Sequence, residues 1–199
     1  MTSQLRPAMT IFAALTVICG VIYPLAVTGI GQAAFSEKAN GSMVEANGKP
    51  IGSSLIGQAF SSPQYFWGRP SATAPMPNNA AGSGGSNLGT NNPALIDAVK
   101  GRIDALHAAE ASVGAPNTAP VPVDLVTASG SGLDPDISLA AARYQAGRVA
   151  AARKMSPEQV QALIDQHQLK QYLGFFGEAR INVLELNLAL DQAKPYVKG

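Results

Sequence analysis

The chain has 199 residues, of which 14 are Lys or Arg and 13 are Asp or Glu, so its formal net charge is +1. A nucleic-acid-binding protein gathers basic residues on one face to displace counterions from phosphates, and this sequence has no such concentration. The single cysteine, Cys19, falls in an apolar run near the start. The residues beyond that run therefore cannot form a disulfide or a cysteine-based metal site.

The first element is a long apolar segment, since residues 7–35 contain no charged side chain. A helix rises ~1.5 Å per residue, so about twenty residues cross the hydrocarbon core of a bilayer. We therefore expect a cytoplasmic tail at 1–7 and a transmembrane helix at 8–35. The alternative is a signal peptide cleaved near 31–33, but its apolar part would span roughly 7–15 residues. The length favours an uncleaved anchor.

The charges that flank the anchor predict its orientation. Arg6 precedes it without a neighbouring acid, whereas Glu37 and Lys38 follow it. Excess basic charge stays in the cytoplasm, so we expect the rest of the chain, 36–199, to be periplasmic. Pro24 lacks a backbone donor and predicts a kink near 19–20.

Two pairs of small residues lie four apart on the anchor, Thr16 with Gly20 and Gly29 with Ala33. Small residues let membrane helices approach closely, so each pair is a candidate packing site for another subunit. The alternative, that small residues are simply common in membrane helices, stays open.

Loop-rich sequence follows. Residues 36–50 predict a hairpin or loop, with a tight turn at Asn47-Gly48, because both residues tolerate positive φ. Residues 51–71 favour short strands. We expect the aromatic residues of that stretch to pack in the core: Phe60, Tyr65, Phe66 and Trp67. Residues 72–92 predict a flexible loop that is mobile unless a partner holds it.

Three helices are predicted from caps and apolar spacing. Asn92, followed by a proline, begins a helix over 93–110. Its apolar face would consist of Leu95, Ile96, Val99, Ile103 and Leu106. A second helix covers 138–153, and a capping box that opens at Ser156 begins a third over 157–168.

The arginines of the second helix are five residues apart: Arg143, Arg148 and Arg153. This spacing makes them fan around the helix instead of forming one basic stripe.

Two segments complete the second part of the chain. Residues 124–138 predict a short strand at 124–127, a Ser/Gly turn, and a helix start at Asp134-Pro135. Residues 180–187 predict a strand. The expected fold class is α+β: one N-terminal transmembrane helix followed by a single small, loop-rich domain.

Signs of catalysis are weak. A serine nucleophile on a sharp elbow needs glycine two residues before and two residues after it. Neither Ser86 nor Ser131 meets this pattern. A catalytic triad also needs a histidine, and we expect His107 and His167 to lie on solvated helix faces.

Signs of an anion or metal site are weak as well. The Ser/Gly turn at 129–132 resembles an anion-binding nest, because it precedes a predicted helix. However, Asp134 and Asp136 would stand where phosphate oxygens should lie. The closing glutamate of a twelve-residue calcium loop is also absent. We therefore predict no catalytic, cofactor-binding or metal-binding residue.

Several motifs, taken in chain order, are similar to those of one protein family. They lie at 23–25, 52–58, 65–66, 69–71, 86–89, 126–135, 137–138, 142–145, 148–150, 177–178 and 182–187. The most distinctive are Ser129-Gly130-Ser131-Gly132-Leu133-Asp134-Pro135, and Gln145 with Arg148. On these residues the chain resembles the C subunit of the bacterial Kdp potassium-transporting P-type ATPase, the KdpC family. Tyr23 and Pro24 carry part of the match and join Thr16, Gly20, Gly29 and Ala33 as candidate packing residues.

The resemblance implies a non-catalytic subunit of the bacterial inner membrane, with one membrane span and a periplasmic domain. Its partners would be a channel-like potassium-binding subunit, an ATP-hydrolysing subunit and a small single-span subunit. Members are described as catalytic chaperones that support ATP use, so ATP and potassium would act through the partners. Two other functions stay open: a membrane-anchored envelope hydrolase and a solute-binding module.

Overall fold

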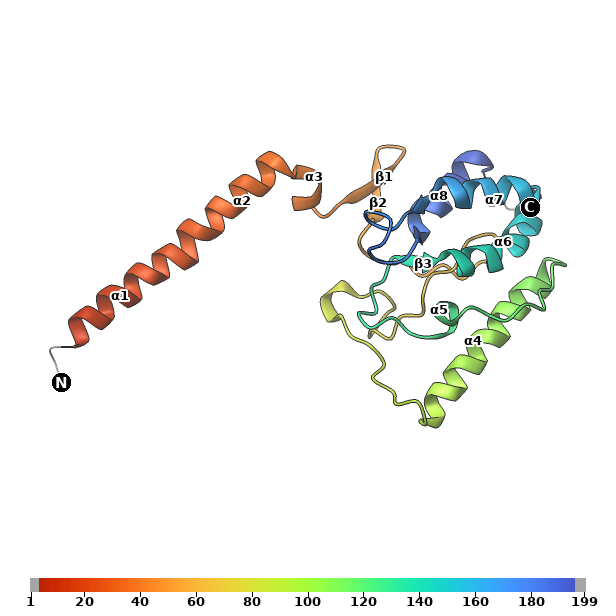
Figure 1. The fold of residues 1–199 in the computed structure, drawn as a ribbon, viewed down its shortest axis with the longest axis horizontal. Coiled ribbons are helices and arrows are strands. Elements are labelled where there is room, and N and C mark those ends of the chain that lie inside the picture. Colours follow the sequence, from red (N-terminus) through yellow and green to blue (C-terminus); the bar gives the residue numbers. More distant parts are fainter. Residues whose placement is uncertain (1–3, 196–199) are drawn as a thin grey trace. The chain divides into compact units, whose positions relative to one another are not determined.

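The computed structural model describes residues 4–195, which divide between Met43 and Val44 into two compact units (Figure 1). The first unit holds the apolar segment and one further helical turn at Ser36–Ala39, and the second holds the three-stranded sheet and the helices from Pro93 onward. The fold class is α+β, as expected from the sequence.

The apolar segment forms one continuous helix of 30 residues. It comprises α1 (Leu5–Val17), a π-helical turn η1 (Ile18–Ile22) and α2 (Tyr23–Ala34). At ~1.5 Å per residue its length is about 45 Å, enough to cross a bilayer. None of its side chains is buried within the unit. Its apolar surface is therefore available to lipid or to other helices.

Pro24 disturbs the helix where the sequence predicted. A proline cannot donate to the carbonyl four residues earlier, here that of Gly20. The amide of Tyr23 instead donates to the carbonyl of Ile18, five residues back. The disturbance therefore takes the form of a π-helical turn.

A short link joins the helix to a hairpin. One helical turn, α3 (Ser36–Ala39), precedes β1 (Met43–Ala46) and β2 (Lys49–Ser53), which pair with each other. Asn47 and Gly48 have φ values of 53° and 72°. The predicted tight turn is confirmed, and its two positive φ values suit the twist of a hairpin.

A small antiparallel sheet lies in the second unit. Its strands are β3 (Asp136–Ser138), β5 (Arg180–Asn182) and β4 (Gln168–Leu169), in the order β3-β5-β4. Ile181 of the central strand pairs with Ile137 on one side and with Gln168 on the other.

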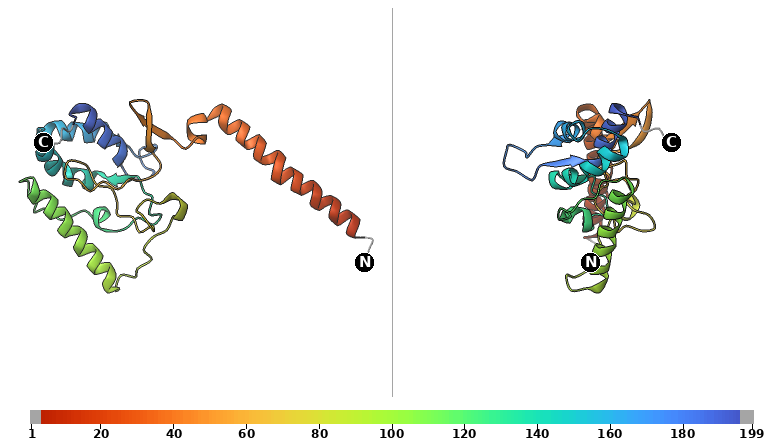
Figure 2. Two further views of the ribbon diagram at one scale, coloured as in Figure 1. Left: turned by 180° about the vertical axis from the view of Figure 1, so that it is seen from behind. Right: turned by 90° about the vertical axis from the view of Figure 1, so that its right-hand side faces the viewer.

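Five helices surround this sheet (Figures 1 and 2). They are α4 (Pro93–Ser112), α5 (Val123–Val126), α6 (Leu139–Arg153), α7 (Pro157–Gln166) and α8 (Val183–Ala193). Among them, α6 packs most extensively on α7, and α8 contacts both α7 and β5. The fully buried core includes Phe66, Ala141, Ala142, Val149, Val160, Ile164, Ile181, Leu186 and Leu190.

The predicted helix caps are confirmed. The side-chain oxygen of Asn92 accepts a hydrogen bond from the amide of Ala94 at 3.0 Å. Ser156 and Gln159 form the reciprocal capping box, with distances of 2.9 and 3.2 Å. One expected apolar contact of α4 is wrong, because Ile96 is exposed.

Three predicted secondary structures are wrong. The strand at 124–127 is the helical turn α5, whose Asp124 carboxylate accepts the amide of Ser138 at 2.8 Å. The helix expected from Asp134-Pro135 begins only at Leu139, after β3. The strand at 180–187 ends at Asn182, which caps α8 by accepting the amide of Glu185 at 3.1 Å.

The segment between β2 and α4 has less regular secondary structure than predicted, but hydrogen bonds within the segment hold part of it. Residues 54–71 contain no strand, although Phe66 lies in the core as expected. The predicted flexible loop 72–92 holds a 3-10 turn, η2 (Ala80–Gly82). A hydrogen bond holds part of this loop, because the backbone amide of Asn78 donates to Ser71 Oγ at 2.9 Å.

Candidate functional site

Polar side chains of α6 and α8 converge on an irregular stretch of backbone, residues 63–67, which we call the strap. Each of its five carbonyl oxygens accepts a hydrogen bond from one of these side chains. Buried backbone groups need partners, and the strap has no neighbouring strand to supply them. The side chains therefore take the place of a sheet ladder.

Arg148 and Gln145 of α6 act together on the strap. The Nη1 atom of Arg148 donates to the carbonyls of Pro63 and Tyr65, at 2.5 and 3.0 Å. Its Nη2 atom donates to Gln145 Oε1 at 2.6 Å. The Gln145 amide in turn bonds both backbone groups of Trp67, at 2.8 and 3.1 Å. The guanidinium also lies 4.7 Å from the centre of the Trp67 ring, which adds a cation–π contact.

A second arginine continues the same arrangement. Arg153 Nε donates to the carbonyl of Gln64 at 2.7 Å, and its Nη2 atom pairs with Asp191 of α8 at 2.7 Å. The guanidinium lies 4.8 Å from the centre of the Tyr65 ring. Arg148 and Arg153 are 1 % and 3 % exposed. The five-residue spacing in the sequence predicted that the arginines point in different directions from the helix. It did not indicate that Arg148 and Arg153 are buried.

A buried acid lies near Arg148. Glu110, at the end of α4, is 2 % exposed. Burial lowers the pKa of Arg148 to about 10, while the charge of Glu110 opposes the shift. Burial, and then the charge of Glu110, raise the pKa of the Tyr144 hydroxyl to about 12. This cluster links α4 to α6 through electrostatics in a low-dielectric setting.

The Ser129–Pro135 motif ties several loops together instead of forming an open site. The amide of Ser129 donates to the carbonyl of Pro70 at 3.0 Å. The carbonyl of Ser131 accepts the amide of Gly84 at 2.9 Å, and that of Leu133 accepts the amide of Gly57 at 2.8 Å. The motif residues serve mainly to hold three loop segments in register.

Two further contacts join the Ser129–Pro135 motif to residues 69–71. Ser71 Oγ donates to the carbonyl of Gly132 at 2.7 Å. Asp134 pairs with Arg69 at 3.0 Å. Gly132 has a φ of +68°, and a Cβ atom built there would lie 2.5 Å from Thr73 Cγ2. Both the backbone conformation and the close approach therefore require glycine at this position.

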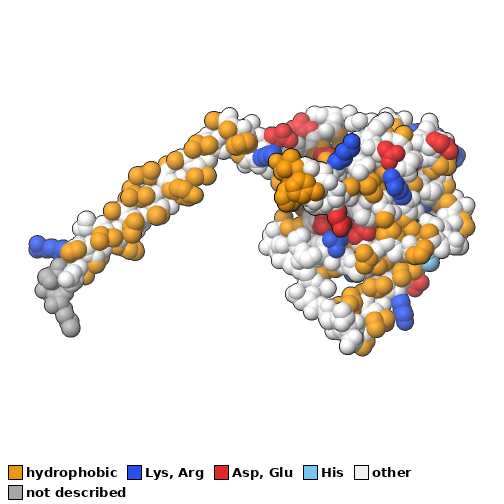
Figure 3. Space-filling model, viewed as in Figure 1, with side chains coloured by type: hydrophobic (Ala, Val, Ile, Leu, Met, Phe, Trp, Pro, Cys, Tyr) orange, Lys and Arg blue, Asp and Glu red, His pale blue; other side chains and the backbone are white. Residues whose placement is uncertain are grey.

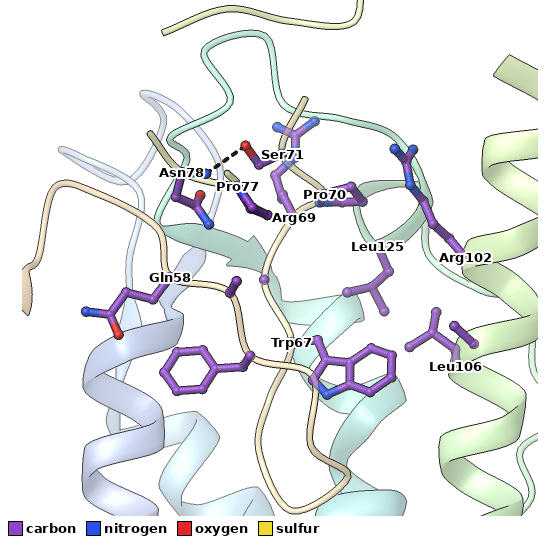
Figure 4. Close-up of a pocket in the computed structure, with 14 residues that line it drawn as sticks. Gln58, Trp67, Arg69, Pro70, Ser71, Pro77, Asn78, Arg102, Leu106 and Leu125 are labelled. Atoms are coloured by element: carbon purple, nitrogen blue, oxygen red, sulfur yellow. Dashed lines mark hydrogen bonds between the residues drawn. The ribbon is translucent and has the colours of Figure 1, made fainter. Parts of the chain in front are cut away.

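A pocket of about 270 Å³ lies beside the strap and the motif (Figure 4). In Figure 4, Trp67, Leu106 and Leu125 form an apolar side, and the guanidinium groups of Arg69 and Arg102 lie at the opposite end. Both arginines are engaged by the chain, since Arg69 pairs with Asp134 and Arg102 Nη1 donates to the carbonyl of Val126 at 2.6 Å. The pocket therefore has an apolar side and an end with two guanidinium groups, one of which is already paired with a carboxylate.

The residues considered for hydrolysis are not brought together in a triad. Ser131 Oγ accepts the amide of Leu133 at 3.1 Å. His107 is exposed on α4, as expected. His167 is half-buried instead, and its Nδ1 atom lies 3.0 Å from the carbonyl of Leu163.

The acidic residues considered for metal or phosphate binding are used structurally. Asp134 Oδ1 accepts the amide of Asp136 at 3.1 Å. Asp136 pairs with Arg180 at 2.7 Å. Burial raises the pKa of Asp136, while Arg180 opposes the shift.

The candidate packing residues of the anchor all lie on the exposed helix. Thr16 Oγ1 donates to the carbonyl of Phe12 at 2.8 Å, within the helix. No heavy atom beyond the helix's own backbone lies within 4 Å of a Cβ built at Gly20 or Gly29. Tyr23, Pro24 and Ala33 are exposed as well. The predicted packing against another subunit stays a prediction.

Sequence reasoning missed Arg153, Asn187 and Glu110 as buried polar residues. One signal was present for Gln145, which falls between Ala142 and Val149 at the spacing of a buried helix face. The corresponding signal for Asn187 was hidden, because residues 180–187 were interpreted as a strand.

Comparison with known proteins gives consistent results over nearly the whole chain. The family described as "KdpC: K+-transporting ATPase, c chain" matches residues 5–192. A potassium-transporting ATPase KdpC subunit of Herminiimonas arsenicoxydans is 71 % identical, covering 96 % of this chain and 99 % of its own. Proteins of the same description are 69 % identical in Janthinobacterium sp. (strain Marseille), covering 96 % and 100 %, and 60 % identical in Paraburkholderia phytofirmans, covering 98 % and 99 %.

Two lines of evidence thus agree. Among the described residues, one apolar helix is long enough to cross a membrane, and the motif residues that the sequence singled out connect the loops of the second unit. The chain belongs to the KdpC family, the c chain of the K+-transporting ATPase.

Proposed function

We propose that the chain is a non-catalytic accessory subunit of an ATP-driven potassium uptake complex, which it assembles and stabilises. The observation that carries this proposal is that the buried polar side chains of the second unit bond the protein's own backbone. Gln145, Arg148, Arg153 and the motif at 129–135 bond the chain's own backbone. A catalytic group must instead reach a substrate.

The anchor supports an assembly role. Its whole length is exposed within its unit, so lipid or partner helices must cover it. In this proposal the potassium-binding, channel-like subunit contacts the anchor at Thr16, Gly20, Tyr23, Pro24, Gly29 and Ala33. The other partners are an ATP-hydrolysing subunit and a small single-span subunit. ATP and potassium act through these partners, and the chain supports ATP use indirectly.

The proposed location is the bacterial inner membrane, with the N-terminus in the cytoplasm and the second unit in the periplasm. Arg6 in the first turn of α1 supports this orientation. Protease added to spheroplasts should cleave the second unit, whereas protease added to sealed inverted vesicles should not. The opposite pattern would contradict the orientation.

Replacement of the anchor tests the assembly role. In the test variant, residues 7–34 are exchanged for an unrelated apolar helix of the same length, which keeps Arg6 and holds the chain in the membrane. The control variant keeps the anchor and carries Lys100→Ala on an exposed face of α4. We expect the first variant to lose co-purification with the transporter and the second to retain it. Full assembly of the exchanged variant would contradict the proposed packing of the anchor.

The pocket beside the strap favours one second candidate, a solute-binding module. Its volume of about 270 Å³ is slightly below the roughly 300–1,000 Å³ of typical ligand sites. A ligand would raise the melting temperature of the full chain in a concentration-dependent manner. Loss of that rise in Arg102→Met would favour this candidate. Turnover of ester, peptide or phosphate substrates that is lost in Ser131→Ala would instead favour an anchored hydrolase.

A further inference from the structure

The hairpin between β4 and β5 exposes four large apolar side chains, which we call the aromatic tip: Tyr172, Leu173, Phe175 and Phe176. Their exposed fractions are 73, 68, 68 and 55 %. In the right-hand view of Figure 2 the hairpin projects from the rest of the unit. In Figure 3 a hydrophobic cluster stands on the surface where Figure 1 draws this hairpin.

The aromatic tip is held in a defined shape. The amide of Tyr172 donates to the carbonyl of Phe176 at 3.0 Å, and the reverse bond is 2.9 Å. Gln171 Nε2 donates to the carbonyl of Gly177 at 2.8 Å. The rings of Phe175 and Phe176 contact each other, with centroids 4.2 Å apart. The tip is therefore presented in an ordered form, which reduces the entropy that binding would cost.

The exposed apolar surface of the aromatic tip is large compared with that of a typical monomeric protein. Large side chains of this kind contribute roughly 150–250 Å² each when they are buried, so the tip offers about 500 Å². This is as large as the largest apolar patch on a typical monomer, and such patches often mark interaction sites. It is too small for a stable interface of its own, which needs about 800 Å² per partner. The tip therefore fits a partner that a second contact already holds nearby.

The membrane anchor supplies that second contact. About ten residues separate the end of α2 from the second unit, so the tether reaches at most ~35 Å. Two surfaces held in one membrane meet at a high effective concentration, and a small contact then suffices.

The charges around the tip favour a protein partner over a lipid surface. Residues 168–178 contain one base, Lys170, and one acid, Glu178. Binding to anionic lipid depends on clusters of roughly 4–8 basic residues. Aromatic side chains that project from a surface are typical anchors for a partner's pocket.

We propose that the aromatic tip inserts into an apolar hollow on the extramembrane surface of a membrane-embedded subunit of the same transporter. This inference rests on the proposed assembly role and names the part of the second unit that makes the contact. The anchor and the tip then act as two linked contacts to one assembly.

Photo-crosslinking of the full chain in native membranes, expressed with the whole transporter, tests the inference. A benzophenone amino acid is placed at Phe175 and, as a control, at Lys100 on the exposed side of α4. We expect an adduct with another transporter subunit from position 175 and no adduct from position 100. An adduct with lipid alone, an adduct with a second copy of the chain, or no adduct from position 175 would overturn the inference.

A pair of substitutions provides an independent readout. Phe175→Ser/Phe176→Ser removes two of the tip's three rings, whereas Val123→Ser changes an equally exposed residue elsewhere. We expect the dissociation rate of the double variant from the purified complex to rise roughly tenfold, with an unchanged melting temperature. A rate equal to that of Val123→Ser would overturn the inference. Failure of the wild-type chain itself to co-purify would instead contradict the proposed function.

Discussion

The side-chain amide of Asn187 pairs with both backbone groups of Phe66, a residue 121 positions earlier in the chain. The amide of Phe66 donates to Asn187 Oδ1 at 2.8 Å, and Asn187 Nδ2 donates to the carbonyl of Phe66 at 3.0 Å. One asparagine of α8 thus replaces a neighbouring strand at the centre of the strap. Both residues are buried, so this pairing is shielded from water.

Asn187→Ala should destabilise the second unit by about 2–4 kcal/mol, because it leaves two buried backbone groups of Phe66 without partners. Gln161→Ala is the control, since the Gln161 amide bonds Asp165 on an exposed surface. The control should change stability by less than about 0.5 kcal/mol. Chemical denaturation of the full chain in detergent measures both values. Equal effects of the two substitutions would contradict the role of Asn187.

Arg148→Met should lower the free energy of unfolding by about 3–5 kcal/mol, because it leaves the carbonyls of Pro63 and Tyr65 without this donor and removes the positive charge near the buried Glu110. Arg148→Lys should rescue little, since an ammonium group cannot reproduce the bonds of the planar guanidinium. In combination with Glu110→Gln, the loss should be smaller than the sum of the single losses. Additive losses in this double-mutant cycle would show that the two charges are independent.

Tyr144→Phe should alter the alkaline branch of the stability profile. The pKa of Tyr144 is about 12 in the folded chain and 10.0 when unperturbed. Because the pKa is higher in the folded chain, the neutral Tyr144 hydroxyl contributes fully to the free energy of unfolding below pH 10. This contribution is lost as the pH rises toward 12. Wild type should therefore lose stability relative to Tyr144→Phe across this interval.

Arg148, whose pKa is lowered to about 10, titrates in the opposite direction and is present in both proteins. Tyr172→Phe, at the exposed tip, serves as the control and should follow wild type. Denaturation curves at a series of pH values provide the measurement. A constant difference in stability between wild type and Tyr144→Phe from pH 9 to 12 would contradict the raised pKa of Tyr144.

Gly132→Ala should be destabilising by about 2 kcal/mol or more, because alanine is strained at a φ of +68° and its Cβ would meet Thr73 and the carbonyl of Gly84. Gly130→Ala is a matched control two residues away. Its φ is not in the left-handed region, and no atom lies within 4 Å of the added Cβ. The control should be nearly neutral in thermal melts. A loss of similar size in both variants would contradict the assigned contacts.

Local signals in the sequence predicted local structure well. The caps at Asn92 and Ser156 and the turn at Asn47-Gly48 depend on bonds between residues close in the chain, and all three are present. The anchor was equally clear, because its length and lack of charge are properties of one segment.

The errors arose where contacts distant in sequence decide the structure. Residues 180–187 contain both strand-like and helical apolar spacing, and Asn182 settles the choice by capping α8. The strand predicted at 124–127 is a helical turn because Asp124 bonds the end of β3. Burial of Arg148 and Arg153 depends on the strap, which lies more than 80 residues earlier. No local pattern could reveal that the strap covers this face of α6.

The side chains of α6 and α8 bond the backbone of the strap and not its side chains, and this has an evolutionary consequence. Carbonyl oxygens are common to all amino acids, so Gln64 can be exchanged without removing the bond that its carbonyl accepts from Arg153. The donors have no such freedom, since few other side chains reach the same oxygens with the same geometry. A saturation library should therefore tolerate many replacements at position 64 and very few at 145, 148, 153 and 187, an asymmetry between the two sides of one contact.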